Sequence, residues 1–191
     1  MRERVADLAR LWLTRTGARL DFHFWTAPDV DVGGADIRIA FDPARGSWSW
    51  VGTQATRIAR EKPTMNLGWM TVELPEDQAR SVVLHEFGHA IGLIHEHLHP
   101  LHRIDWDRER VIADLRASQG WDDATISANM FEEPPPDAVF ATAFDPSSIM
   151  MYAVPEHWTR DDFSVGWNTD LSASDIGLIQ EAYGVRPEWR G

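Results

Sequence analysis

Cysteine is absent from this chain of 191 residues, and its absence limits how the fold can be held together. No disulfide can cross-link the chain, so its stability must come from packing alone. A bound metal ion would have to be held by His, Asp, Glu or Tyr, because no thiolate is present. The sequence also lacks an apolar run near the ~20 residues of a membrane-spanning helix, so no membrane span is predicted.

Basic side chains are few, with 18 Lys and Arg against 30 Asp and Glu and a net charge of −12. Phosphate binding needs clustered Lys and Arg, so the balance predicts no nucleic-acid partner. The acidic side chains are spread along the chain and are typical of a solvated surface. The N-terminal segment has the spacing of an amphipathic helix in place of an uninterrupted apolar stretch, so no signal peptide is predicted in this sequence.

The order of the predicted elements favours an α+β fold in a single catalytic domain, residues 1–191. Apolar residues at helical spacing predict a helix over residues 3–16, and strand-like stretches follow at 19–25, 36–41 and 63–72. Further helices are predicted over 76 to about 91, 108–117, 122–130 and 172–184. Because the strands gather before residue 75 and the helices mostly follow it, α+β is favoured over alternating α/β.

The segment from His85 to His95 reads His-Glu-Phe-Gly-His-Ala-Ile-Gly-Leu-Ile-His. Residues four apart lie on one face of a helix, so His85 and His89 can direct their imidazoles at one point. On a continuing helix, His95 would lie about 9 Å beyond His89 and about 240° around the axis, out of reach of the same metal ion. The chain must therefore reverse at Gly92, since glycine enters left-handed conformations at little cost.

Three neutral histidines predict one catalytic Zn²⁺ ion with a position left open for water. Zinc lowers the pKa of that water toward 7, and Glu86 can accept its proton as general base and pass it to the leaving amine. The predicted activity is therefore that of a zinc-dependent endopeptidase. Three further histidines, His97, His99 and His102, match no closed zinc pattern and are interpreted as surface or loop-packing residues.

Two other interpretations share part of this pattern. A zinc-stabilised scaffold could bind peptides without cutting them, through the same three ligands, but such a site would have no use for Glu86. A structural protein with a chance motif would bind no stoichiometric zinc. Turnover of a generic protein substrate and metal analysis separate these interpretations from the enzyme.

The pattern HExxHxxGxxH with a later Met-turn resembles the metzincin metallopeptidases. Within that clan the sequence is most similar to the astacin family, because Glu96 follows the third histidine and residues 46–52 read Gly-Ser-Trp-Ser-Trp-Val-Gly. The resemblance covers roughly residues 5–184. It implies a zincin fold, with a twisted, mostly parallel sheet and an active-site helix above a helical and irregular C-terminal subdomain. The two subdomains would span about 1–93 and 94–191.

Residues 148–152, Ser-Ile-Met-Met-Tyr, resemble the Met-turn. In the astacin interpretation, Met150 would form an apolar base under the metal. Tyr152 would be able to reach zinc and would then hydrogen-bond the oxyanion during catalysis. The same string can be read with Met151 as the turn residue, which would resemble matrixins, where the tyrosine is not a ligand. Glu96 favours the astacin interpretation.

The resemblance also implies how a substrate would bind. A peptide or protein would lie in extended form along the cleft and add as a strand to the segment around Asn66, Leu67 and Gly68. Because the family is mostly secreted, a secreted or extracellular location is expected. We expect a monomer, although the sequence does not fix the oligomeric state.

Overall fold

The computed structural model describes residues 1–25, 34–135 and 141–189, and its contacts divide the chain into two compact units. The first unit comprises residues 1–94 and 169–191, and the second comprises residues 95–168. The division into subdomains of about 1–93 and 94–191 stays a prediction. The principal elements are α1 (Arg2–Ala9), α2 (Leu11–Thr16), β1 (Ile39–Ala40), β2 (Ser47–Ser49), β3 (Met65–Leu67), α3 (Glu76–Ala90), α4 (Arg108–Gln119), α5 (Asp123–Met130) and α6 (Ala173–Tyr183). Short 3₁₀ turns lie between them at η2 (Pro43–Arg45), η3 (Gly52–Arg57), η4 (Glu96–Leu98) and η5 (Glu156–Trp158).

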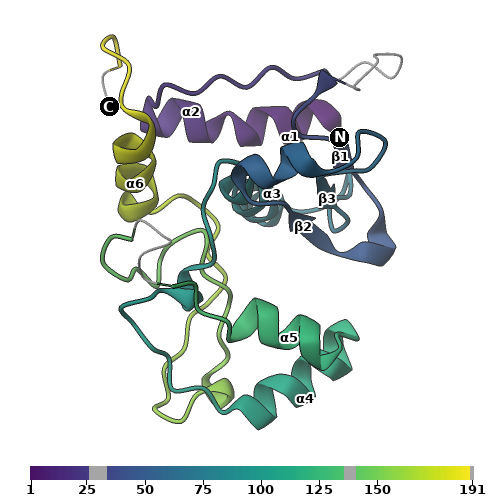
Figure 1. Cartoon of the computed structure of the whole chain (residues 1–191), viewed down its shortest axis with the longest axis vertical. Coiled ribbons are helices and arrows are strands. Elements are labelled where there is room, and N and C mark those ends of the chain that lie inside the picture. Colours follow the sequence, from purple (N-terminus) through teal and green to yellow (C-terminus); the bar gives the residue numbers. More distant parts are fainter. Residues whose placement is uncertain (26–33, 136–140, 190–191) are drawn as a thin grey trace. The chain divides into compact units, whose positions relative to one another are not determined.

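Helices α1 and α3 pack together in the first unit, and α6 packs against α2 (Figure 1). Trp12 on α2 is fully buried, and its indole Nε1–H donates to the carbonyl of Leu84 in α3 over 3.0 Å. The predicted helix over 3–16 is interrupted at Arg10, whose carbonyl accepts from the amide of Leu13 in a three-residue turn. The helices predicted at residue 76 and beyond all form, with ends within two residues of those expected.

The sheet of the first unit has the order β1-β3-β2 in the described residues. Strand β1 pairs with β3 in parallel, and β2 pairs with β3 in antiparallel fashion, with Trp48 opposite Asn66. The mixed α+β class is confirmed, but the expectation of a mostly parallel sheet is wrong for this part of the chain. The physical reason is that β2 runs back along β3 after the 3₁₀ turn η2, a turn that Asn66 holds in place through the backbone of Asp42 and Gly46.

Strand β3 is the central strand, so its backbone is paired on both sides. The prediction that a substrate strand adds at Asn66–Gly68 is therefore wrong, since strand addition needs an unpaired edge. Strand β2 lies instead at an edge of the described sheet. Because of its two serines and the glycines around it, this segment does not have a composition typical of a strand.

The strand predicted over residues 19–25 does not form. Its aromatic residues pack on a helix instead, with the rings of Phe22 and Phe24 centred 5.6 and 6.0 Å from that of Phe87 on α3. Its backbone is held by side chains, because the guanidinium of Arg186 donates to the carbonyl of Leu20. These two aromatic rings are thus partly buried without sheet pairing, a case in which tertiary packing overrides strand propensity.

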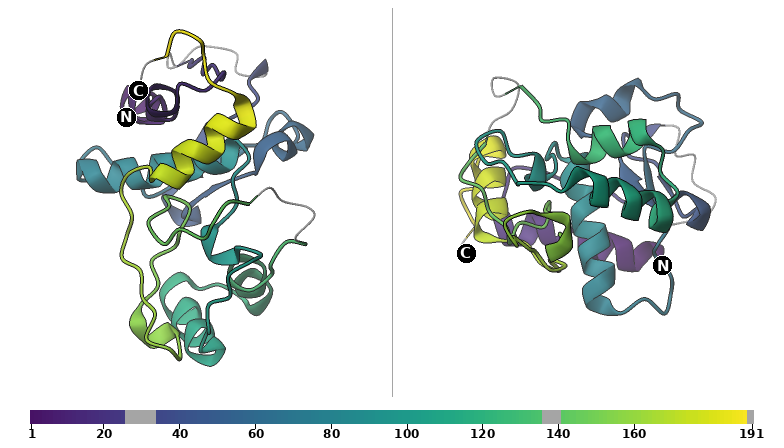
Figure 2. Two further views of the ribbon diagram at one scale, coloured as in Figure 1. Left: turned by 90° about the vertical axis from the view of Figure 1, so that its left-hand side faces the viewer. Right: turned by 90° about the horizontal axis from the view of Figure 1, so that it is seen from below.

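Helices α4 and α5 lie side by side in the second unit (Figures 1 and 2). Each begins at an aspartate whose side chain accepts from the helix backbone, Asp107 for α4 and Asp122 for α5. Their apolar faces form one core with the segments that flank them, made of Ile104, Trp106, Val111, Leu115, Ile126, Met130, Met151 and Val154. Among the described residues, no helix has the length and apolar character to cross a bilayer.

Candidate functional site

Helix α3 presents His85 and His89 one turn apart, with ring centroids separated by 4.9 Å and ring planes at 90°. The helix forms here because it begins directly after Pro75, carries Glu76 and Asp77 in its first turn and buries Val82, Val83 and Phe87 on its inner face. Its burial fixes the direction of both imidazoles. The predicted helix and the shared face of the two histidines are therefore present.

The chain leaves α3 through a turn at Gly92, where φ is +103°. The amide of Leu93 donates to the carbonyl of Gly88, and the amide of Gly92 donates to that of His89, each over 2.9 Å. These two bonds form a Schellman motif, which ends a helix and satisfies its last carbonyls. The predicted reversal at Gly92 is confirmed, and the positive φ explains why glycine occupies this position.

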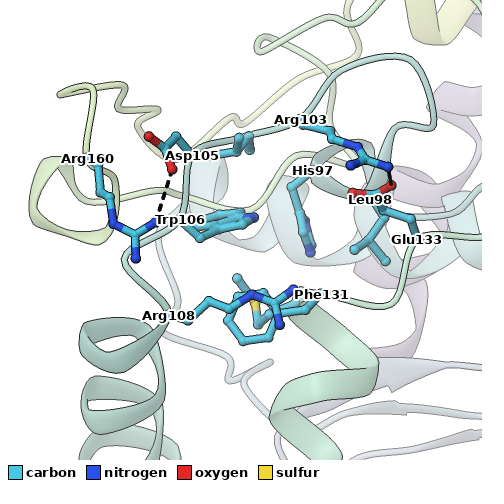
Figure 3. A pocket seen from close by; sticks show the side chains of 11 residues that line it. His97, Leu98, Arg103, Asp105, Trp106, Arg108, Phe131, Glu133 and Arg160 are labelled. Atoms are coloured by element: carbon cyan, nitrogen blue, oxygen red, sulfur yellow. Dashed lines mark hydrogen bonds and ion pairs between the residues drawn. The ribbon is translucent and has the colours of Figure 1, made fainter.

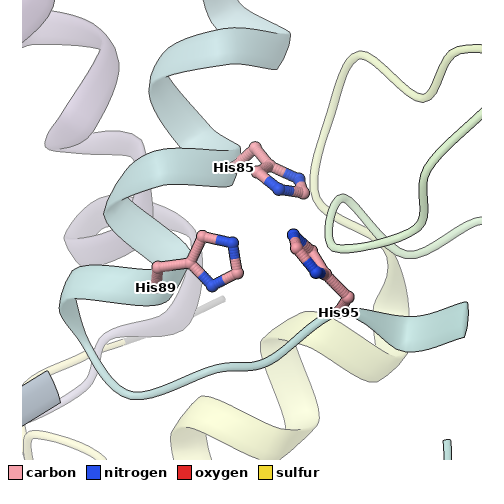
Figure 4. Close-up of side chains that lie close together, drawn as sticks. All are labelled: His85, His89 and His95. Carbon is pink, nitrogen blue, oxygen red and sulfur yellow. The ribbon is translucent and has the colours of Figure 1, made fainter. Parts of the chain in front are cut away.

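After the reversal, one ring nitrogen of His85, one of His89 and one of His95 lie within 4.8 Å of one another (Figure 4). In the described ranges, no other group of three or more His, Cys, Asp or Glu side chains comes together in this way. Three imidazoles at this separation fit a divalent cation that prefers nitrogen ligands in tetrahedral array. The geometry thus brings together all three residues that the sequence singled out as metal ligands.

The tautomer of His89 follows from its hydrogen bond. Nδ1 lies 2.9 Å from the carbonyl oxygen of Leu93, and a carbonyl can only accept, so Nδ1 carries the proton and Nε2 carries a lone pair. Burial lowers the pKa of His89 below its ordinary value and outweighs the opposite effect of this bond, so the neutral ring is favoured. A hydrogen bond from the ring nitrogen that does not bind the metal orients a metal-binding histidine.

Glu86 is buried, with 4% of its surface exposed, and its Oε2 has no hydrogen-bond partner among the described residues. Burial raises the pKa of Glu86 to about 8. A buried, unpartnered carboxylate oxygen is costly unless a cation or a substrate group satisfies it. Glu86 directly follows His85 in sequence. A water molecule held by a metal ion would satisfy its unpartnered oxygen, so the residues present fit a zinc ion.

Tyr152 lies beside His95 in the second unit, with ring centroids 4.2 Å apart. It also stacks on His97 at 4.8 Å, and His97 in turn stacks on His95 at 5.1 Å. His97 is buried, and its Nε2 lies 2.8 Å from the carbonyl of Asn129. Sequence reasoning treated His97 as an ordinary packing residue and missed this contact with the ligand and the tyrosine, because no local spacing rule predicts a stack between residues 97 and 152.

The turn that precedes Tyr152 distinguishes the two methionines. Met151 packs into the hydrophobic core of the second unit, whereas Met150 is buried with its carbonyl accepting from the amide of Glu96 over 3.0 Å. The amide of Met150 donates to the hydroxyl of Ser148, which closes the turn. Because Met151 is part of the core, Met150 remains the candidate for the residue under the metal, as the astacin interpretation has it.

The other two histidines pack in the loop as predicted. His99 is buried with Nε2 2.9 Å from the carbonyl of Thr142, and its Nδ1 accepts from the amide of Leu101. His102 stacks on Phe144 with centroids 3.8 Å apart. Neither joins the group of three ligands.

A cavity of about 230 Å³ in the second unit is lined on one side by His97, and it differs from the metal group in its chemistry (Figure 3). Arg103 and Arg160 line it, and each forms an ion pair with a carboxylate, Glu133 and Asp105 respectively. Arg108 stacks over the ring of Phe131 at 4.4 Å. Among the described lining residues, no three His, Cys, Asp or Glu side chains converge as a metal-ligand set.

Comparison with solved structures shows which known proteins this chain is similar to. A structure of myroilysin is 34% identical with a TM-score of 0.87, covering 97% of this chain and 87% of that one. A crystal structure of myroilysin is also 34% identical, with a TM-score of 0.67 over 95% of this chain and 77% of that one. The chain belongs to the astacin family of metzincin metallopeptidases. This family consists of zinc-dependent endopeptidases, and the group of three histidines agrees with that membership.

High choriolytic enzyme 1, a hatching enzyme zinc-protease from the medaka fish Oryzias latipes, shares the astacin fold at 17% identity. Its TM-score is 0.53, and the match covers 96% of this chain and 82% of that one. A scan against models of protein families finds no match, and neither does a search of curated proteins. Family membership therefore rests on the structural matches to myroilysin.

The three-histidine group predicts one zinc ion per chain and a strong dependence on each ligand. We expect His95→Ala to weaken zinc binding by at least about 100-fold, because two imidazoles and water cannot replace a tetrahedral set of three. Competition with a chromophoric chelator measures the affinity. The control is His102→Ala, a histidine of the same loop that stacks on Phe144 and should leave the affinity unchanged. Full affinity in His95→Ala would place the third ligand elsewhere.

Proposed function

We propose that the chain hydrolyses peptide bonds, with Glu86 as general base and with zinc held by His85, His89 and His95. The observation that carries this proposal is the combination of three converging imidazoles with a buried carboxylate oxygen that no described residue satisfies. A zinc site that only stabilised the fold would have no use for such a carboxylate, whose burial without a partner costs free energy. The family supports the same activity.

When bound, zinc would acidify a water molecule and polarise the scissile carbonyl. Glu86 then accepts the proton of the attacking water and delivers it to the amine that leaves. Its burial suits this role, because burial raises the pKa of the carboxyl and so strengthens its affinity for the transferred proton. His89 keeps its orientation through the Nδ1–H bond to Leu93.

Tyr152 is proposed to stabilise the oxyanion through its phenol. Its ring lies against the imidazole of His95, which supports a position within reach of the reacting carbonyl. A neutral O–H donor aimed at developing negative charge lowers the barrier without changing the binding of the substrate in its ground state.

An extended peptide substrate is proposed to add to the outer edge of β2. The amide of Trp50 donates to Thr64, and the amide of Gly68 donates to Gly46, each over 3.0 Å. In an antiparallel pair the bonding alternates, so the N–H and C=O groups of Ser47 and Ser49 point away from β3. In the described sheet no strand covers this edge, which leaves these groups available for strand addition.

Family membership also supports an extracellular location, and the protein is proposed to be a monomer. Detection of the protein in the culture medium of its host, and a mass from light scattering that matches 21.7 kDa, are the expected results. Retention inside the cell or a stable dimer would contradict these two proposals.

The role of Glu86 predicts that Glu86→Gln lowers kcat/KM by at least about 100-fold, the usual contribution of a general base. Zinc should remain bound, because the three imidazoles are unchanged. Hydrolysis of casein, blocked by a chelator in the parent protein, provides the assay. Exposed Glu73 offers the matched control, and Glu73→Gln should behave as the parent. Undiminished turnover in Glu86→Gln would remove the mechanism.

The role of Tyr152 predicts that Tyr152→Phe lowers kcat by about 100-fold with a much smaller change in KM. Phenylalanine preserves the ring that packs against His95 and stacks on His97, so only the hydroxyl is tested. Steady-state kinetics on a fluorogenic peptide separate the two constants. An unchanged kcat would favour the matrixin-like interpretation, in which this tyrosine has no part in the chemistry.

Strand addition at β2 predicts an alternating dependence on the amides of the substrate. N-methylation of a residue that faces Ser47 or Ser49 should raise KM about ten-fold, because it removes a backbone hydrogen bond and adds a methyl group at the edge. Methylation of the intervening residue is the control and should have little effect. A set of singly methylated peptides measures this, and equal effects at neighbouring positions would contradict the proposal.

A further inference from the structure

The turn after α3 contains one carbonyl on each side of Gly92, and each accepts a hydrogen bond from a side chain. On one side the Leu93 carbonyl accepts from the imidazole of His89. On the other, the Ile91 carbonyl accepts from the hydroxyl of Tyr183 over 2.7 Å. Tyr183 is the last residue of α6, 92 positions further along the chain. Two residues far apart in sequence thus donate to the carbonyls of the two residues that flank a single glycine.

We propose that Tyr183 is a positioning residue, which fixes the turn at Gly92 and thereby the ligand His89 and the path of the chain toward His95. The inference rests on the proposed zinc site, and it adds a residue that the zinc motif does not contain. In the described contacts, Tyr183 touches neither Glu86 nor the three histidines of the metal group. Its effect must therefore pass through the Ile91 carbonyl.

Glycine makes this support necessary. With no Cβ, Gly92 has access to many backbone conformations, and nothing lies within 4 Å of the position where a Cβ would be. Packing on that side therefore does not hold the turn. The backbone bond from Leu93 to Gly88 and the two side-chain bonds fix it instead. Loss of the Tyr183 bond would let the peptide group between Ile91 and Gly92 rotate and would weaken the neighbouring bond from His89.

The hydroxyl of Tyr183 is held by a rigid helix. Helix α6 begins with a capping box of Ser172 and Asp175, and Gln180 donates to the carbonyl of Thr16 over 2.9 Å. Burial raises the pKa of the Tyr183 phenol above its usual value, so the group remains a donor throughout the neutral range. A donor on a fixed element constrains its acceptor more tightly than one on a loop.

The experiment compares Tyr183→Phe with Gln180→Met in the full chain. Each variant removes one hydrogen bond from α6 to a backbone carbonyl of the first unit, and only the first of these carbonyls belongs to the turn. We expect both variants to lose similar thermal stability without metal. Only Tyr183→Phe should bind Zn²⁺ more weakly, by about three- to ten-fold in a chelator competition, the range that follows from one net hydrogen bond.

A second measurement needs no metal. Amide hydrogen exchange at Leu93, whose N–H closes the turn onto Gly88, should accelerate in Tyr183→Phe and stay unchanged in Gln180→Met. Equal zinc affinity in the two variants, or unaltered exchange at Leu93, would overturn the positioning role. If the parent protein itself bound no zinc, the proposed function would fail together with the ligand-positioning role. Exchange at Leu93 would still report whether Tyr183 holds the turn.

Discussion

The whole site depends on a reversal of the backbone at Gly92, because helix geometry alone cannot bring a third histidine to the point where His85 and His89 converge. The Schellman motif ends α3 one residue after Ala90, and a φ of +103° sends the chain away from the helix axis. The same turn presents the Leu93 carbonyl to the Nδ1 of His89. One turn therefore determines both the route to His95 and the tautomer of His89.

In a chain without cysteine, polar side chains tie distant segments together where a secreted protein often has disulfides. Arg4 donates to the carbonyl of Leu74 and pairs with Glu76, which anchors the start of α3. Arg38 donates to the carbonyls of Ala35, Ile58 and Lys62. Hydrogen bonds between guanidinium groups and backbone carbonyls satisfy polar groups of loops that have no ladder partner. These contacts support the segments that lead into β1 and α3.

The sequence was most informative where local geometry and chemistry act together. The spacing of His85, His89 and His95 required the turn at Gly92, and both the spacing and the turn are local properties of the chain. Helices were predicted well because their apolar periodicity and their caps lie within a few residues, as for α4 after Asp107 and α5 after Asp122. The metal ligands and the helices could thus be read before any contact between distant segments was known.

The remaining features depend on contacts between distant residues, which a single sequence does not reveal. Residues 19–25 have strand-like composition, yet they pair with no neighbouring strand, and Phe22 and Phe24 pack on the ring of Phe87. Strand β2 forms in a serine-containing segment because β3 and the Asn66 bonds align it. The contact of Tyr183 with Ile91 spans 92 positions and has no local signal. The sequence therefore predicted the metal ligands, but it did not predict the pairing of the strands or the contacts that hold the site's turn.

Glu96 shows how a residue that identifies the family also takes part in the structure. Its amide donates to the carbonyl of Met150, and its carboxylate accepts from the amide of Asp145 over 2.8 Å. Both bonds join the segment just after His95 to the turn that precedes Tyr152. Tyr152 is only two residues beyond Met150, so both bonds lie close to the point where its ring packs against His95. A glutamate directly after the third ligand therefore couples that ligand to the tyrosine, and an aliphatic residue at this position would remove the carboxylate that accepts from the amide of Asp145.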